Sequence, residues 1–241
     1  MYSWLKKYVD PIIPLFSIVP LLSCFALNMV VYSGTMILCD DWYHHDFTSS
    51  LDRAIPLMPS WIIIYFGCYL FWIVNYIMVA RINRNNARAF YRFVATDMIS
   101  RLLCLVFYVL LPTTNVRPDI TGESVWDNLM RFLYGLDKPS NLFPSIHVLV
   151  SWLCFVGIRN SKKVRSYYKI FSCIMAFLVW ASTLFTKQHY IIDGLFAIVF
   201  AELIYLLNQK TTIYVYLKNA FQIINYKLFK LLKGDLCEQE N

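Results

Sequence analysis

Hydrophobic positions along the chain fall into six long runs separated by short polar segments. The runs cover residues 11–32, 57–80, 94–111, 143–158, 170–185 and 190–207. Because a helix needs about 20 apolar residues to cross a bilayer, each run can span a membrane or nearly so. The fourth and fifth are short, and they require small tilt, local thinning or flanking anchors. The pattern predicts an all-α, polytopic membrane protein, a six-transmembrane-helix bundle that forms a single domain over residues 1–241.

The first run follows Lys6 and Lys7, a charge pattern that secretory signal peptides share. No small-residue cleavage site follows this run, and apolar residues continue past Asn28. A lipoprotein-type site at Cys24 is excluded for the same reason. We therefore expect an uncleaved membrane anchor.

The composition supports a membrane protein rather than a water-soluble or disordered one. Of the 241 residues, 59% are hydrophobic and 15% are charged, and the mean hydropathy is +0.51. Soluble domains contain about 45–50% apolar and about 25% charged residues. The net charge of +7 would favour nucleic acid as the partner of a soluble protein. In a membrane protein it first indicates loop charges that set orientation, so we expect membrane lipids and no nucleic acid as partners.

The cations concentrate in alternate connecting segments. Sixteen of the 22 Lys and Arg residues lie before the first run, between the second and third, between the fourth and fifth, and after the last. The intervening segments, 33–56, 112–142 and 186–189, carry most of the acidic loop residues. Since positive loops stay on the cytoplasmic side, both termini are predicted to be cytoplasmic. The three intervening segments then face outward, with the plasma membrane as the expected location.

Residues 211–233 predict a further, amphipathic helix. Its apolar positions are spaced alternately by four and three residues, at Leu217, Phe221, Ile224, Leu228 and Leu231. Two interpretations stay open. The helix lies on the inner leaflet as an interfacial tail, or it packs on the end of the bundle.

Charged residues inside the runs are expected to be structural. Asp97 and Arg101 are four residues apart and predict an ion pair on one helix face. Glu202 is expected to be paired inside the bundle. The outer segment 41–46, with His44 and His45, lacks a defined ligand spacing, and the seven cysteines have neither a zinc spacing nor a disulfide framework. We expect no metal and no cofactor.

One candidate catalytic segment is residues 141–147, Asn-Leu-Phe-Pro-Ser-Ile-His, where an outer loop enters the fourth run. Because proline is favoured at the first helical position, Ser145 and His147 should lie in the first turn. A helix N-terminus presents free backbone N–H groups and a positive dipole end, and both bind anions.

A second candidate segment, residues 182–193, covers the turn between the last two runs. His189 and Asp193 are four residues apart and share a helix face. A carboxylate in this position accepts one imidazole N–H and leaves the other nitrogen free as a nucleophile or base.

Together with Arg117-Pro118, these segments resemble the type 2 phosphatidic acid phosphatase superfamily, membrane lipid phosphate phosphatases related to vanadium haloperoxidases. The signatures of that family are K-x6-R-P, P-S-x-H and S-R-x5-H-x3-D, in this order. The second is intact at residues 144–147, and the third keeps its spacing with Thr183 in the place of Arg. The first retains Arg117-Pro118 but has Leu110 in the place of Lys. The resemblance covers roughly residues 52–207.

The resemblance implies a metal-independent phosphohistidine mechanism at the outer face. His189 attacks phosphorus, Asp193 orients its ring, and His147 protonates the leaving oxygen and then helps to activate water. The resemblance also implies side chains that bind phosphoryl oxygens, namely Arg117, Ser145 and Ser182, with Lys187 as a partial substitute for the missing cations.

Three functions stay open from the sequence. The first is hydrolysis of a lipid monophosphate or diphosphate. The second is transfer of the phosphoryl-containing group to an alcohol, resembling inositol phosphorylceramide synthase. The third is a catalytically inactive relative, since two family cations are absent. A transporter is disfavoured, because no internal repeat is visible and only seven glycines are present.

Overall fold

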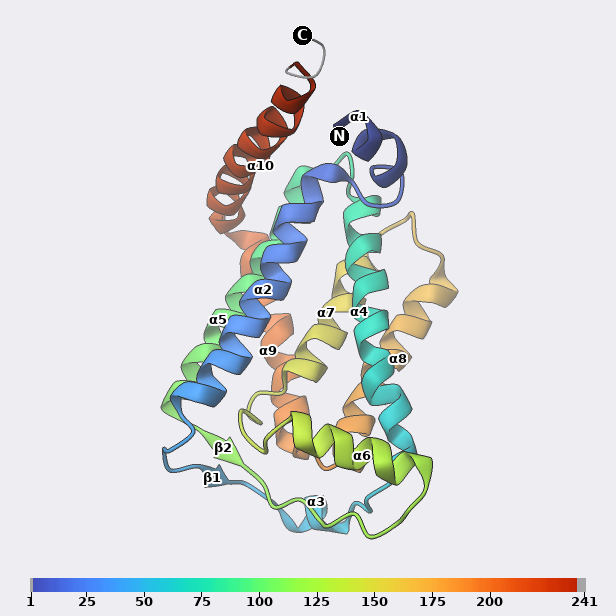
Figure 1. Ribbon diagram of the computed structural model, residues 1–241, viewed down its shortest axis with the longest axis vertical. Coiled ribbons are helices and arrows are strands. Elements are labelled where there is room, and N and C mark those ends of the chain that lie inside the picture. The colour runs from blue at the N-terminus through green and yellow to red at the C-terminus, as the bar shows by residue number, and fades with distance from the viewer. Residues whose placement is uncertain (1, 238–241) are drawn as a thin grey trace.

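The fold is a bundle of long helices that run roughly along one axis, with a short helix lying across one end (Figure 1). This computed structural model describes residues 2–237, and the side chains of residues 2–231. The long helices of the bundle are α2 (Leu15–Leu38), α4 (Ile62–Ile82), α5 (Ala87–Leu110), α7 (Ile146–Arg159), α8 (Ser166–Phe185) and α9 (Ile191–Lys210). The other helical elements are α1 (Tyr2–Trp4), a π turn (Leu5–Val9), α3 (Ser50–Ala54), a 3-10 turn (Pro59–Trp61), α6 (Val125–Leu136) and α10 (Ile213–Cys237).

Five of the helices in the described part of the chain are long and apolar enough to cross a membrane. They are α2, α5, α8, α9 and the continuous helix of residues 59–82. This result confirms an all-α fold and indicates a multi-pass membrane protein. The predicted sixth span, α7, has 14 residues and a length of only about 21 Å. It packs against α4, α8 and α9, so the bundle encloses most of its surface.

Two helices extend more than four residues beyond the predicted apolar runs. Helix α5 begins seven residues before the predicted start at residue 94, because the Asn86 side chain caps it by accepting from Ala89 N. Its added turns bury Phe90 and Tyr91. Helix α2 continues beyond residue 32, and the Thr35 hydroxyl bonds back to Val31 O within it.

Helix α6 lies in the segment predicted as an outer loop. Ser124 and Asp127 form a capping box at its start, which satisfies two backbone donors that would otherwise be free. Met130 and Leu133 are buried and pack with Ile62 and Tyr65 of α4. Helix α6 therefore closes one end of the bundle over α4 (Figure 1).

Two loops at one end of the bundle are joined by a short parallel pairing between β1 (His45–Asp46) and β2 (Thr113–Thr114). The hydroxyl of Thr113 also accepts backbone N–H groups from Leu142 and Phe143, both at 3.0 Å or less. This arrangement connects the loop before α3, the loop after α5 and the entrance to α7.

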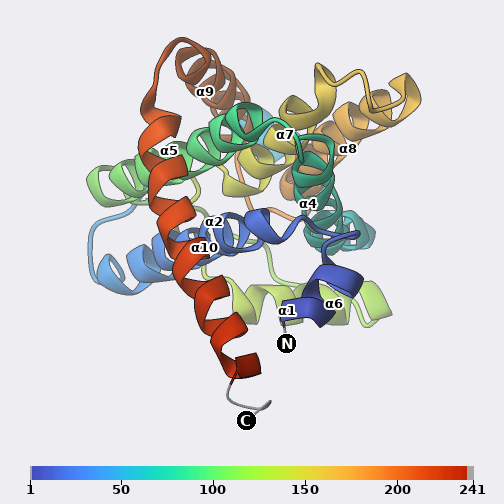
Figure 2. The same cartoon turned by 90° about the horizontal axis from the view of Figure 1, so that it is seen from above.

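Helix α10 follows α9 and crosses the opposite end of the bundle (Figure 2). Tyr214 and Phe221 are buried, and the helix packs against α5 and α2. Further along, Leu228 and Leu231 of the predicted apolar stripe are exposed. The first half of α10 thus packs on the bundle, whereas Leu228 and Leu231 in the second half are not covered by described residues.

The charged residues within the bundle are paired, as expected. Arg101 donates from Nε and Nη2 to the two carboxylate oxygens of Asp97, both at 2.8 Å. Glu202 accepts from Arg159 and from Trp152 Nε1. Both ion pairs link residues within the helical bundle. Neither pair includes a residue of the predicted catalytic segments.

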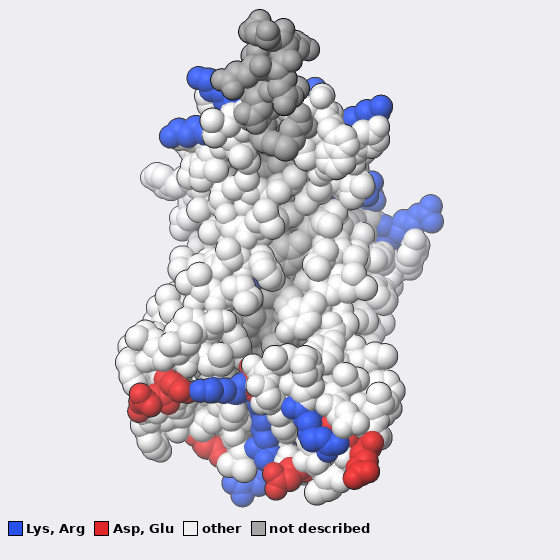
Figure 3. Space-filling model, viewed as in Figure 1, with Lys and Arg blue, Asp and Glu red and all other residues white. Residues whose placement is uncertain are grey.

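Figure 3 shows the distribution of charge on one face of the molecule. Basic side chains gather at the end that carries α10, whereas acidic and basic side chains mix at the end that carries α3 and α6. The band between the two ends is almost free of charge on this face.

Candidate active site

His189 is held by the polar groups around its Nδ1 atom. This nitrogen lies 2.9 Å from Leu142 O and 3.2 Å from Asp193 Oδ2. Because a carbonyl oxygen only accepts, Nδ1 carries the proton and the lone pair resides on Nε2. The Nε2 atom has no hydrogen-bond partner among the described residues. His189 is only 9% exposed, so the ring is fixed while one nitrogen remains available.

Asp193 is positioned by the start of α9. Its Oδ2 accepts from Tyr190 N at 2.9 Å, which caps the helix, as well as from His189. The Asp193 side chain is fully buried, and its Oδ1 has no partner within the described structure. The same carboxylate therefore caps the helix and orients the imidazole.

The turn between α8 and α9 sets the position of His189 along the chain. The carbonyl of Thr183 accepts from Gln188 N and His189 N, at 2.8 and 3.2 Å. Lys187 adopts a left-handed backbone with φ 55°, a conformation that non-glycine residues rarely adopt. The turn thus depends on backbone bonds to Thr183 rather than on the Thr183 side chain.

His147 lies beside His189 in the first turn of α7. The centroids of the two imidazole rings are 5.8 Å apart. Ser145 caps α7 by accepting from Val148 N at 3.4 Å, and its own backbone N–H donates to Asp193 O at 3.3 Å. The two predicted segments are therefore joined directly, at the N-termini of α7 and α9.

Aromatic side chains of α4 surround His147, which is 8% exposed. The ring of Tyr65 lies 4.6 Å from the imidazole and that of Trp72 lies 5.7 Å away, between centroids. The Tyr69 hydroxyl is 3.5 Å from His147 Nε2, a long contact that restricts the ring only weakly.

Arg117 bonds to Gln188, the residue before His189, and backbone carbonyls hold most of its guanidinium. It donates to Asp137 O, and Nη2 donates to Gln188 Oε1 at 2.7 Å. The guanidinium also lies 4.8 Å from the Tyr134 ring centroid. Arg117 Nε and Gln188 Nε2 are buried donors without a partner in the described structure. Two donors near the α8–α9 turn thus keep unused hydrogen-bonding capacity.

The other two predicted phosphate contacts have partners of their own. The Ser182 hydroxyl is fully buried and donates to Val179 O at 2.7 Å within α8. The Lys187 ammonium donates to Asp52 O at 3.0 Å and to Ile55 O. Burial lowers the pKa of Lys187, and the charge of Asp52 partly opposes this shift.

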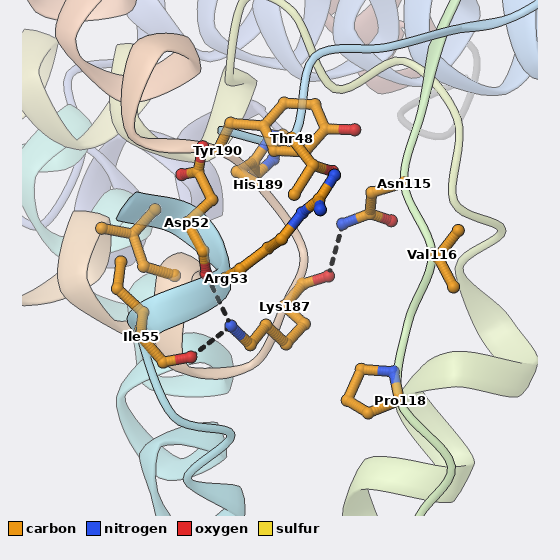
Figure 4. Close-up of a pocket in the computed structure, with 11 residues that line it drawn as sticks. Thr48, Asp52, Arg53, Ile55, Asn115, Val116, Pro118, Lys187, His189 and Tyr190 are labelled. Atoms are coloured by element: carbon orange, nitrogen blue, oxygen red, sulfur yellow. Dashed lines mark hydrogen bonds between the residues drawn. The ribbon is translucent and has the colours of Figure 1, made fainter. Parts of the chain in front are cut away.

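A pocket of about 300 Å³ opens beside His189 among the loops at this end of the bundle. Figure 4 shows the side chains that line it, which come from the loop before α4, the loop after α5 and the α8–α9 turn. Lys187 and His189 are the predicted site residues among them, and Asp52, Arg53 and Asn115 are polar residues that the sequence analysis did not select. The sequence contained one signal for this loop, the Ser49–Asp52 capping box at the start of α3.

The described residues contain no group of three or more His, Cys, Asp or Glu side chains that could hold a metal ion. In segment 41–46, His44 contacts Trp42 O, and Asp46 accepts from Thr48 and Tyr190. These side chains are therefore used in local structure.

Fold and site together define a helical membrane protein with two adjacent histidines and an orienting aspartate at one end of the bundle. A family model described as the PAP2 superfamily matches residues 35–207. The chain belongs to this superfamily, as the resemblance predicted, and membership indicates phosphatase-type activity. No curated protein and no solved structure matches the chain.

Proposed function

We propose that this protein is an integral-membrane phosphatase that removes phosphate from a lipid monophosphate or diphosphate through a phosphohistidine. The observation that carries the proposal is the state of His189. Leu142 O and Asp193 bind its Nδ1, so Nε2 is free, and the His147 ring is 5.8 Å away. A nucleophile oriented by a carboxylate and paired with a second acid–base group suits phosphoryl transfer.

In the first step, His189 Nε2 forms a bond to phosphorus as the bond between phosphorus and the lipid oxygen breaks. His147 donates a proton to that oxygen. The Asp193 carboxylate offsets the positive charge of the phosphorylated ring. Arg117 and the Ser145 hydroxyl bind phosphoryl oxygens, because Arg117 Nε and the Ser145 O–H are not committed as donors.

In the second step, water attacks phosphorus and His147 accepts its proton. The bond from phosphorus to Nε2 breaks, which releases inorganic phosphate and restores His189. Side chains supply all of the proton transfers and charges, so the proposed reaction requires no metal and no cofactor.

The site lies at the end of the bundle that carries α3 and α6, opposite the basic end. Positive loops mark the cytoplasmic side. This distribution supports an extracytoplasmic site in the plasma membrane, with both termini in the cytoplasm. Labelling of Arg84→Cys or Lys163→Cys variants by an impermeant thiol reagent in intact cells would contradict this orientation.

The test is phosphate release from a panel of lipid phosphates and diphosphates by detergent-purified protein. The wild type should release phosphate in the presence of a chelator, and His189→Ala should fall to background. His44→Ala is the matched control, since His44 lies at the same end and its ring bonds to the local carbonyl of Trp42. Activity that survives His189→Ala would contradict the mechanism.

The same assay separates the two alternative functions. Transfer of the phosphoryl-containing group to an added alcohol, without phosphate release, would identify a transferase. Failure on every substrate and acceptor would identify a catalytically inactive relative.

A further inference from the structure

The two positions at which the family carries cations hold uncharged residues in this chain, Leu110 and Thr183. Leu110, in the Lys position, is 76% exposed on the outside of α5. Thr183, in the Arg position, is fully buried, and its hydroxyl donates to Trp180 O. Positive charge beside His189 must therefore come from elsewhere in this chain.

Arg53 on α3 is placed to supply that charge. It lines the pocket beside His189, together with Lys187 and Asn115. Figure 4 shows its side chain extending across the pocket, in this view between His189 and Lys187. The guanidinium has no hydrogen bond or ion pair with any described residue. Its five N–H donors are therefore available, in a planar arrangement that matches a phosphate group.

Lys187 serves a different purpose, because it fixes the backbone on both sides of Arg53. Its ammonium donates to the carbonyls of Asp52 and Ile55. The Asp52 carboxylate in turn accepts from Ile191 N at 2.8 Å, at the first turn of α9. The helix that carries Arg53 is thus attached at two points to the segment that carries His189.

Asp46 is the carboxylate whose charge couples to Arg53. Partial burial opposes its ionisation, but hydrogen bonds from Thr48 and Tyr190, with a contribution from Arg53, hold the pKa of Asp46 below its usual range. Its Oδ1 accepts from Thr48 N at 2.8 Å and from Tyr190 Oη at 2.6 Å, and it forms no ion pair with Arg53. Asp46 therefore leaves the Arg53 guanidinium unpaired.

We propose that Arg53 is a phosphate-binding residue of this site and that Lys187 is a positioning residue that holds it there. The inference rests on the proposed function, since it assigns a further contact to the same phosphoryl group. Arg53 replaces, from the loop before α4, the positive charge that the family carries at the positions of Leu110 and Thr183.

The test measures binding of inorganic phosphate and orthovanadate to the purified full-length protein by isothermal titration calorimetry, beside KM and kcat for a lipid phosphate that the wild type hydrolyses. Arg53→Ala should weaken phosphate binding and raise KM by about tenfold or more, as expected for loss of a charged hydrogen-bond donor. Arg53→Lys should recover part of the loss, because the charge remains but the planar donor pair does not. Lys138→Gln is the matched control, since it removes an exposed cation at the same end that pairs with Asp40.

The outcomes separate this inference from the proposed function. Hydrolysis and anion binding that are equal in wild type and Arg53→Ala would overturn the role of Arg53 and leave the phosphatase intact. A wild type that neither hydrolyses lipid phosphates nor binds phosphate or vanadate would overturn both. Equal losses in Arg53→Ala and Lys138→Gln would also overturn the assignment, because they would reflect net charge alone.

Discussion

Two buried pairs in this protein share the same spacing and differ in what they leave unbound. Asp97 and Arg101 lie four residues apart on α5, and His189 and Asp193 lie four residues apart at the start of α9. In the first pair both carboxylate oxygens accept from Arg101, which also donates to Asn28. In the second pair His189 Nε2 and Asp193 Oδ1 have no partner in the described structure.

The difference supports the proposal that the second pair performs chemistry. A buried polar network with every group bonded is rigid and contributes to structure. A buried pair that keeps a free lone pair can act on a ligand. Spacing alone predicts both pairs from the sequence, whereas their functions follow from the remaining hydrogen-bonding capacity of each.

Of the following substitutions, which distinguish the two pairs, His147→Ala is expected to lower kcat most. Loss of a general acid–base group lowers turnover by about 10²- to 10⁴-fold. The melting temperature in detergent should fall only through lost ring packing with Tyr65 and Trp72, because the single polar side-chain contact of His147 among the described residues is the long one to Tyr69. The measurement is kcat for a lipid phosphate, compared with His44→Ala. Unchanged kcat would remove His147 from the mechanism.

Breaking the Asp97–Arg101 pair should lower the stability and leave kcat largely unchanged. Arg101→Met leaves the Asp97 carboxylate buried without its partner, which costs about 3–5 kcal/mol of stability. The double variant Asp97→Leu, Arg101→Met should recover much of the loss, and kcat of the folded fraction should stay near the wild-type value. Thermal unfolding in detergent and kcat per folded molecule measure both. A folded Arg101→Met protein without activity would contradict a structural role.

Asp193→Asn removes the negative charge of the carboxylate and keeps nearly the same side-chain shape. The amide oxygen can still accept from Tyr190 N, but the negative charge beside His189 is lost. Because Leu142 O also holds Nδ1, we expect a fall in kcat of about 10- to 100-fold, the size of one charged hydrogen bond. Steady-state kinetics on the folded variant measure it, and a kcat equal to the wild type would show that the charge is not used.

The smallest effect is expected from Lys187→Met, which removes the two bonds to the carbonyls that flank Arg53. KM should rise about three- to tenfold, with a smaller change in kcat, since a positioning contact is lost and the nucleophile stays. Lys138→Met is the control. A larger effect on kcat than on KM would instead place the ammonium on the reacting group.

The sequence predicted the all-α class, the superfamily and the ion pair of Asp97 with Arg101, because apolar runs, motif spacing and the i,i+4 rule are local signals. It did not predict α6, whose Ser124–Asp127 capping box stands in a segment interpreted only as a loop. Nor did it select Arg53. The position of Arg53 near His189 depends on bonds from Lys187 to the carbonyls of Asp52 and Ile55, which lie 135 and 132 residues away in sequence. Hydrophobic periodicity and motif spacing cannot predict contacts between residues so far apart in sequence.

The central claim is that His189 Nε2 becomes covalently phosphorylated. The direct measurement is a rapid acid-free quench of the purified protein mixed with a lipid phosphate that carries radioactive phosphorus, followed by peptide mapping. The account predicts an acid-labile, alkali-stable label on the peptide that carries His189, and no label in His189→Ala. Phosphate release by the wild type with no label on His189, or with label on another residue, would contradict it.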